Sequence, residues 1–257
     1  MGHCDGASMD GCADDHPETR ELREAVRETL EERYPTVGAL IDDGFLPYFD
    51  SLDRDEGGWS HWLSPDNIDD DGILDPDRPE SVLVDNERWE PIGVMFIATR
   101  DGETVDPPPA VYEDGDAGEV EDEDDSEGSE RDEGDGSDGE RGHKDHGDPT
   151  RCSPWHYHAG LPGRLAWWYY QEVYANEHED GSRRLPCRTP CMLHVWTVEH
   201  PDGVYAHGGP PAEYREGPEA DDAGFETDAE PDDDELGWDV LPDELVPDRL
   251  PGDVGLP

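Results

Sequence analysis

The chain has 257 residues, of which 70 are Asp or Glu and 18 are Lys or Arg, so its formal net charge is −52. Such a surface repels nucleic-acid phosphates and anionic lipid head groups, and we expect neither as a partner. No apolar run is long enough to span a bilayer, and residues 1–16 lack the apolar region of a signal peptide, so we predict a cytoplasmic protein without membrane contact.

The acidity itself has two explanations, which are intrinsic disorder and adaptation to molar salt. Lys144 is the only lysine, and every other cation is arginine. At about 1 M salt the Debye length falls to about 3 Å, so that repulsion between carboxylates is screened. A surface depleted of lysine and rich in Asp and Glu favours a halophilic protein, and disorder then applies only to single segments.

The helices are expected near the N-terminus, after a flexible leader at residues 1–16. Residues 15–34 carry apolar side chains at three- and four-residue spacing, which predicts one amphipathic helix. Thr36 is placed to cap a short second helix over residues 37–43. Residues 69–75 are rich in aspartate but lack the closing glutamate of a calcium loop, so we interpret them as turns.

Residues 81–85 and 91–99 read as two strands of a hairpin. A disordered acidic insertion at about 106–149 follows, inside a single domain that spans residues 17–211. Residues 212–257 form an acidic tail that we expect to be partly docked near residues 236–246. The predicted fold class is α+β, with N-terminal helices packed on an antiparallel β-sandwich or small barrel.

Histidine and tryptophan concentrate in residues 153–211, which hold six of the eleven histidines and four of the eight tryptophans. Three strand-like phrases, at 155–158, 192–196 and 203–207, each carry histidine. Side chains alternate along a strand, so His156 and His158 share a face, with their Cα atoms about 7 Å apart. With His194 and His207 they predict a site for a divalent transition metal such as zinc, copper, iron or nickel.

A second interpretation remains open, in which these histidines are structural. The aromatic run at 167–170 then lines a cleft of a non-catalytic protein that binds a small-molecule ligand or a partner. Nothing in the sequence decides whether any reaction is catalysed, and nothing predicts an oligomeric state.

The five cysteines are predicted to be free thiols, because their number is odd and the cytoplasm keeps thiols reduced. Cys187 and Cys191 lie beside the strand of His194. Three roles remain open for them, which are metal ligation, a disulfide across the turn, and burial as thiols.

Several phrases are shared with known proteins. Residues 70–80, 155–158 and 192–196, followed by the Pro–Gly turn at 201–203, resemble an uncharacterised bacterial and haloarchaeal family with D-D-G-x-L-D-P-x-R-P-E, W-H-x-H and M-x-H-V-W segments. That family has no established activity, so the resemblance implies no catalytic role. The H-x-H pair also resembles the first motif of cupins, although no glutamate follows His158 at the expected position and His207 lies one residue too far along.

Overall fold

The computed structural model describes residues 1–49, 58–113, 151–175, 184–215, 217, 220 and 222–252. Its centre is one seven-stranded sheet with the strand order β1-β10-β11-β5-β4-β3-β2, in which every neighbouring pair is antiparallel. The bounds of these strands are β1 Gly2–His3, β2 Leu46–Tyr48, β3 Trp59–Leu63, β4 Ser81–Asp85, β5 Pro91–Ile97, β10 His156–Tyr157 and β11 Met192–Trp196. Two small hairpins accompany the sheet, β6 (Thr99–Arg100) with β7 (Glu103–Thr104) and β8 (Tyr112–Glu113) with β9 (Arg151–Cys152).

The predicted α+β class with an antiparallel sheet is confirmed, and so is the hairpin of β4 and β5. The closed barrel is wrong, because the edge strands β1 and β2 do not pair with each other. Among the described strands no second large sheet faces the first, so the layers are helix, sheet and helix. The two hydrophobic faces of the sheet are covered by helices, which removes the need for a second sheet.

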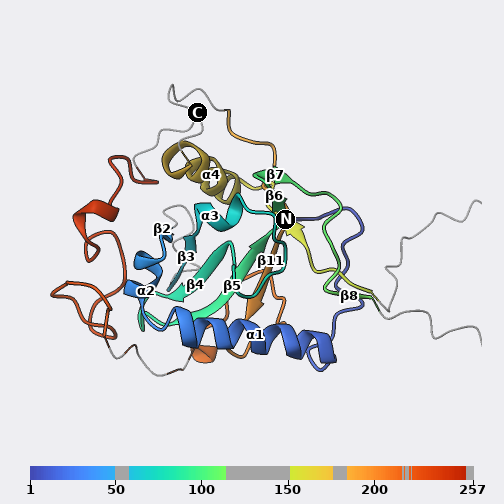
Figure 1. Cartoon of the computed structure of the whole chain (residues 1–257), viewed down its shortest axis with the longest axis horizontal. Coiled ribbons are helices and arrows are strands. Elements are labelled where there is room, and N and C mark those ends of the chain that lie inside the picture. The colour runs from blue at the N-terminus through green and yellow to red at the C-terminus, as the bar shows by residue number, and fades with distance from the viewer. Residues whose placement is uncertain are drawn as a thin grey trace, which may run out of the picture.

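Helix α1 (Pro17–Arg33) covers one face of the sheet, as Figure 1 shows. Pro17 occupies its first turn, and the His16 ring accepts a hydrogen bond from the Glu18 amide at its N-terminus. Val26 and Leu30 are buried against side chains of the sheet, which confirms the apolar stripe that the sequence predicts. Helix α2 (Val37–Asp42) follows, capped by Thr36 as expected.

Helix α4 (Leu161–Tyr169) and its π-helical continuation η2 (Tyr170–Tyr174) lie on the opposite face (Figure 1). Alternation along the strands separates the two faces. Leu193 and Val195 of β11 belong to the core under α1, whereas Met192 and Trp196 belong to the core under α4. This side of the sheet is therefore the one toward which His194 points.

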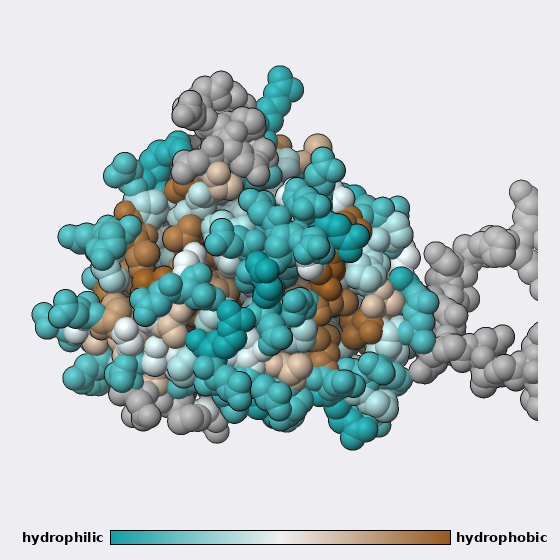
Figure 2. All heavy atoms as spheres, in the orientation of Figure 1, coloured by the Kyte–Doolittle hydropathy of each residue, from teal (hydrophilic) through white to brown (hydrophobic). Residues whose placement is uncertain are grey.

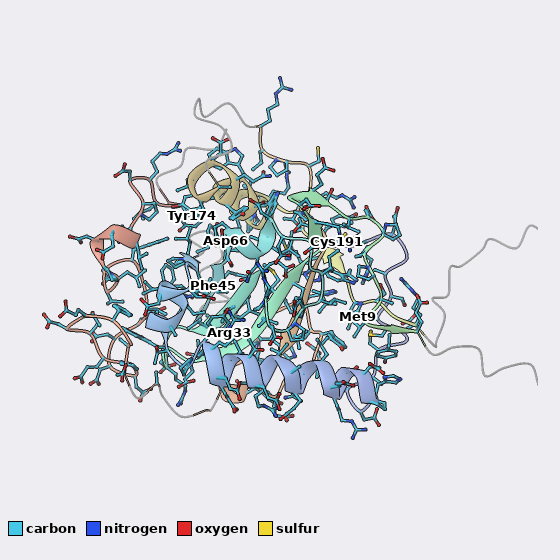
Figure 3. All side chains as sticks on the ribbon, viewed as in Figure 1. Met9, Arg33, Phe45, Asp66, Tyr174 and Cys191 are labelled. Carbon is cyan, nitrogen blue, oxygen red and sulfur yellow. A yellow bond between two sulfur atoms is a disulfide. The ribbon has the colours of Figure 1, made fainter. Side chains whose placement is uncertain are left out.

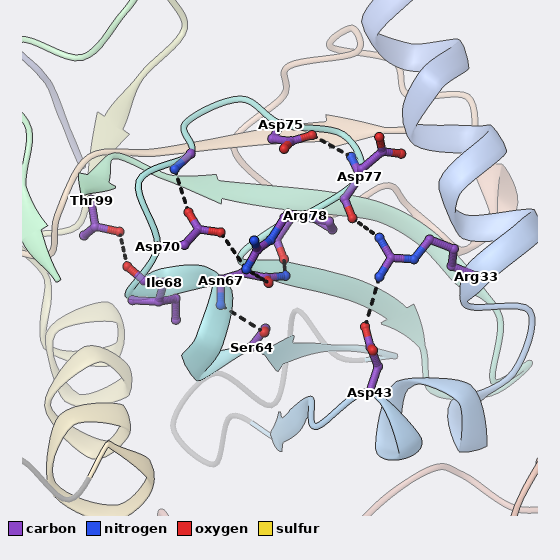
Figure 4. A network of polar contacts seen from close by, with 12 residues as sticks. Arg33, Asp43, Ser64, Asn67, Ile68, Asp70, Asp75, Asp77, Arg78 and Thr99 are labelled. Atoms are coloured by element: carbon purple, nitrogen blue, oxygen red, sulfur yellow. Dashed lines mark hydrogen bonds and ion pairs between the residues drawn. The ribbon is translucent and has the colours of Figure 1, made fainter. Parts of the chain in front are cut away.

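The segment of residues 64–80 carries the short helix α3 (Pro65–Ile68) and turns stabilised by their own side chains (Figure 4). Asp70 accepts a hydrogen bond from the Gly72 amide and pairs with Arg78 at 3.0 Å. Asp75 accepts from the amide of Asp77 at 3.0 Å. These carboxylates stabilise turns, in agreement with their interpretation from the sequence.

Residues 1–16, which the sequence predicts as a flexible leader, instead carry strand β1 and two disulfide cysteines. Cys4 is bonded to Cys191 and Cys12 to Cys152, while Cys187 is a free, exposed thiol (Figure 3). The prediction of free thiols is therefore wrong for four of the five cysteines. The bonded pairs are 187 and 140 residues apart, so spacing along the chain could not reveal them.

The acidic tail docks more widely than predicted. Arg215 is buried and pairs with the buried Asp85 at 3.0 Å, and the Leu236 amide bonds to the Asn86 carbonyl. Leu241 joins the core under α1. The short 3-10 helices η3 (Ala212–Tyr214) and η4 (Asp243–Leu245) lie in this tail. Most of the predicted acidic insertion, residues 114–149, lies outside the described residues.

Hydrophilic residues cover most of the face seen in Figure 2, and hydrophobic residues show only in patches between them. Among the described helices, none is both long and apolar enough to cross a membrane.

Candidate functional site

A cavity of about 820 Å³ opens between the sheet, helix α4 and part of the tail. Its walls are mostly aromatic and apolar, and histidines line part of them. The aromatic lining residues are Tyr48, Phe49, Trp59, Trp167 and Tyr170, and the histidines are His61, His158, His194 and His207. A volume of this size is in the range of small-molecule sites, and an apolar lining with a few polar groups is typical of them.

The histidine cluster, defined as His3, His61, His156, His158, His194 and His207, combines the four predicted residues with two others. His156 is its centre. Its ring centroid lies 5.2 Å from that of His158, 5.3 Å from that of His194 and 4.2 Å from that of His207. The structure thus brings the four predicted histidines together, although they come from separate segments of the chain.

His3 and His61 extend the cluster at its two ends. The His3 ring lies 5.8 Å from that of His207, and the His61 ring lies 6.1 Å from that of His194. Neither residue was predicted from the sequence to belong to this site. His61 could have been found from the sequence, because it lies two residues from Trp59 in a strand and therefore on the same face. His3 could not, because its place depends on the Cys4–Cys191 bond and on the pairing of β1 with β10.

Strand register explains most of this convergence. His156 pairs with His3 on one side and with Met192 on the other, so His194 stands two residues along β11 from the partner of His156. Partners in antiparallel strands point to the same face, which brings His156 and His194 to the side of α4. His207 is not positioned by strand pairing, because residues 203–207 form turns and not the predicted third strand. The Trp196 indole donates a hydrogen bond to the Ala206 carbonyl at 2.9 Å, which holds this turn beside β11.

Burial makes the inner rings unusual. His156 is 1% exposed and His194 is 3% exposed. Both nitrogens of each ring, and Nε2 of His207, are buried without a hydrogen-bond partner of normal geometry. A buried polar group without a partner costs about 1–3 kcal/mol, so five such atoms in three adjoining rings need an explanation.

The electrostatics keep these rings neutral. Burial is the largest cause that lowers the pKa of His156, and the neighbouring His194, His207 and His158 lower it further. Burial also lowers the pKa of His194 well below its usual value, followed by the effects of His61 and His158. Contacts with the main chain of Pro154 and of Ala206, which fall outside normal hydrogen-bond geometry, raise the pKa of His156 and of His194 and so partly offset these shifts. Burial lowers the pKa of His61 to about 3, although its ring keeps partial exposure at the cavity wall.

The two described histidines outside the cluster, His16 and His200, have hydrogen-bond partners. The ring of His200 accepts a hydrogen bond from the Asp202 amide at 3.0 Å, and its other nitrogen lies 3.2 Å from the Gly208 carbonyl. His16 caps α1 and stacks on Tyr112 at 3.6 Å. These two residues show that unpaired nitrogens are a property of the cluster and not of histidine in this chain.

As the side chains stand, no three His, Cys, Asp or Glu residues in the described part of the chain are arranged to hold a metal ion. Four of the five cysteines are unsuited as ligands because they form disulfides. Cys187, the fifth, is exposed, and it does not belong to the lining of the cavity.

Comparison with known proteins does not assign the chain to a family. The chain matches no protein-family model, no curated protein and no solved structure. The site must therefore be interpreted from its own residues.

Proposed function

We propose that the protein binds a divalent transition metal ion through the histidine cluster, with His156, His194 and His207 as the principal ligands and His158 as a fourth. The observation that carries the proposal is the set of five buried ring nitrogens without hydrogen-bond partners. A neutral imidazole binds a metal through one nitrogen and leaves the other for a hydrogen bond, often to a backbone carbonyl.

The spacing of the rings also supports the proposal. Since a zinc–nitrogen bond is about 2.0–2.1 Å, two imidazoles on one tetrahedral ion have ring centres about 5 Å apart. The centroid of His156 lies 5.2 Å from that of His158 and 5.3 Å from that of His194. No three of these side chains are arranged to hold an ion as they stand in the described residues, so binding requires the rings to reorient.

Imidazole ligands suit zinc, copper, iron and nickel, and the cluster contains nothing that selects among these. His158, His194 and His207 line the cavity, so an ion held by them would face it. An ion in that position, with one coordination site open, polarises a bound water or a ligand carbonyl. We assign no reaction.

The test begins with protein purified without a nickel column and treated with EDTA, which is then titrated with Co²⁺ and Zn²⁺. We expect one tight site per chain and a visible Co²⁺ spectrum typical of four or five ligands. His156→Ala and His194→Ala should each weaken binding at least 100-fold. His200→Ala is the matched control and should bind as the parent does, because its ring lies outside the cluster.

The control matters because 70 acidic residues can bind divalent ions weakly and without specificity. Binding that is equally strong in His156→Ala, His194→Ala and His200→Ala would place the ions on the acidic surface and refute the proposal. Folded parent protein that takes up neither ion would refute it as well.

A second candidate function is non-catalytic binding of a small molecule in the cavity. The specific observation in its favour is a volume of about 820 Å³ bordered by five aromatic residues. This function requires no metal, and the histidines would then supply polar contacts or bind ordered water. The two candidates separate experimentally, because ligand binding to EDTA-treated protein supports the second alone.

A further inference from the structure

We propose that the cavity takes a ring-bearing organic molecule, and that it prefers a cationic or uncharged molecule to an anion. This inference rests on the second candidate function, that the cavity is a ligand site, and it specifies the chemical class of the ligand. It concerns the metal-free protein, because a divalent ion held by the histidine cluster would face the cavity and attract anions.

The aromatic side chains that line the cavity are held in place by their neighbours, so they present flat surfaces on which a ring-shaped ligand can pack. Trp59 packs edge-on against Trp196, with centroids 5.4 Å apart and an interplanar angle of 88°. A Cβ atom on Gly209 would lie 2.1 Å from the Trp59 indole nitrogen, so only glycine leaves room for this tryptophan. On the helix side, Trp167 stacks on Tyr170 at 5.0 Å and 25°. Both tryptophans are only partly buried, so part of each ring remains accessible.

The two tryptophans come from different elements that line the cavity, Trp59 from strand β3 and Trp167 from helix α4. Met95, Ile97 and Met192 add apolar surface from the sheet. A ring that enters the cavity exchanges water for apolar and aromatic contact, which is the main favourable contribution to binding in such a site.

The charged groups that line the cavity favour a cationic ligand over an anionic one. No Lys or Arg is found among the lining residues that the structure describes. The tail contributes three exposed carboxylates, those of Asp234, Glu235 and Asp239. Met1 also lines the cavity, so its α-ammonium is a positive group that an anion can meet there, whereas a cation meets three carboxylates and the negative faces of aromatic rings.

The test uses three molecules of similar shape and different charge: 1-(aminomethyl)naphthalene, 1-(hydroxymethyl)naphthalene and 1-naphthoate. Each is titrated by calorimetry into EDTA-treated full-length protein, at the lowest KCl concentration at which the protein stays folded, since salt screens the charges. We expect one site, bound at least tenfold more tightly by the amine than by the carboxylate, with the alcohol between them or equal to the amine.

Variants locate the binding. Trp167→Ala should weaken the amine at least tenfold, while Tyr214→Ala, an exposed aromatic residue outside the lining, should leave it unchanged. Asp234→Asn combined with Glu235→Gln should reduce the preference for the amine over the carboxylate. The matched control, Asp232→Asn with Asp233→Asn, removes the same charge beside the cavity and should keep that preference.

Each other outcome has a definite meaning. If the carboxylate binds as tightly as the amine, the charge selection proposed here is refuted and the ligand site remains. If none of the three molecules binds to folded protein, both this inference and the second candidate function are refuted, and the metal proposal is unaffected. If Trp167→Ala changes nothing, the molecules bind elsewhere and the inference is refuted.

Discussion

Replacing His156 with leucine should make the metal-free protein more stable. This expectation is the opposite of the usual result for a residue that is 1% exposed, since most core substitutions destabilise. It arises because both nitrogens of the His156 ring are buried without a partner, so the parent protein already bears the cost of their lost hydration.

The size of the effect follows from the two nitrogens. In a neutral imidazole one nitrogen is a donor and the other an acceptor, and each costs about 1–3 kcal/mol when it is buried and unpaired. Leucine removes both groups, but its different shape lowers the free energy of unfolding by up to about 1.5 kcal/mol. The net gain in the free energy of unfolding should therefore lie between about 0.5 and 6 kcal/mol in the presence of EDTA.

Zinc should reduce this advantage. A ligand at 100 times its Kd stabilises the folded state by about 2.7 kcal/mol, and only the parent protein should receive that contribution. The assay is urea unfolding of parent and variant, with EDTA and again with zinc. His200→Leu serves as the control: it loses the contacts with Asp202 and Gly208, so it should be less stable than the parent and should still respond to zinc.

The opposite result would refute the reasoning. If His156→Leu is less stable than the parent in EDTA and still gains stability from zinc, the ring is an ordinary packing residue and the cluster is not a metal site. The comparison needs no knowledge of the metal that the protein binds in its own surroundings.

Four further predictions concern stability. Burial is the largest cause that raises the pKa of Glu80 well above its usual value of about 4.5, so the folded state holds its proton to higher pH than the unfolded chain does, and the carboxyl destabilises the fold progressively as the pH rises above about 4.5. Glu80→Gln should then be more stable than the parent at pH 7 but not at pH 4, with a difference that grows by at most about 1.4 kcal/mol per pH unit in urea unfolding at several pH values, and a constant difference would contradict the assignment. Removing the Cys4–Cys191 bond with two serines should lower the free energy of unfolding by about 4 kcal/mol, measured under oxidising conditions, and an unchanged value would mean that the bond does not form. Arg215→Met should cost about 3–5 kcal/mol, because it leaves Asp85 buried and unpaired; adding Asp85→Asn should recover part of that loss, and no recovery would argue against the pair. The melting temperature should rise between 0.2 M and 2 M KCl, since salt screens a net charge of −52, and a fall would contradict the halophilic interpretation.

Local patterns in the sequence determined several of the elements. Helix α1 follows from its apolar spacing, from Pro17 in its first turn and from Pro35 just beyond its end. The hairpin of β4 and β5 follows from two apolar runs joined by a polar turn. Alternation along β11 also predicts correctly that His194 and Trp196 share a face, opposite Leu193 and Val195. These features depend on neighbours a few residues away, so a single sequence is enough to predict them.

Only the tertiary structure decided which segments meet. The sequence predicts a sandwich or barrel, and this is wrong because strand order depends on pairings between distant segments. Local patterns do not encode such pairings, of which β11 with β5 is one. The same holds for the disulfides, whose cysteines are 187 and 140 residues apart, and for His3, which reaches the cluster through one of them. His156, His158, His194 and His207 could be predicted as candidates from their residue type and spacing. Their contact, and the burial that leaves ring nitrogens unpaired, arises from the register of β10 with β11 and from the turn at 203–207, because hydrophobic packing of the whole sheet fixes both.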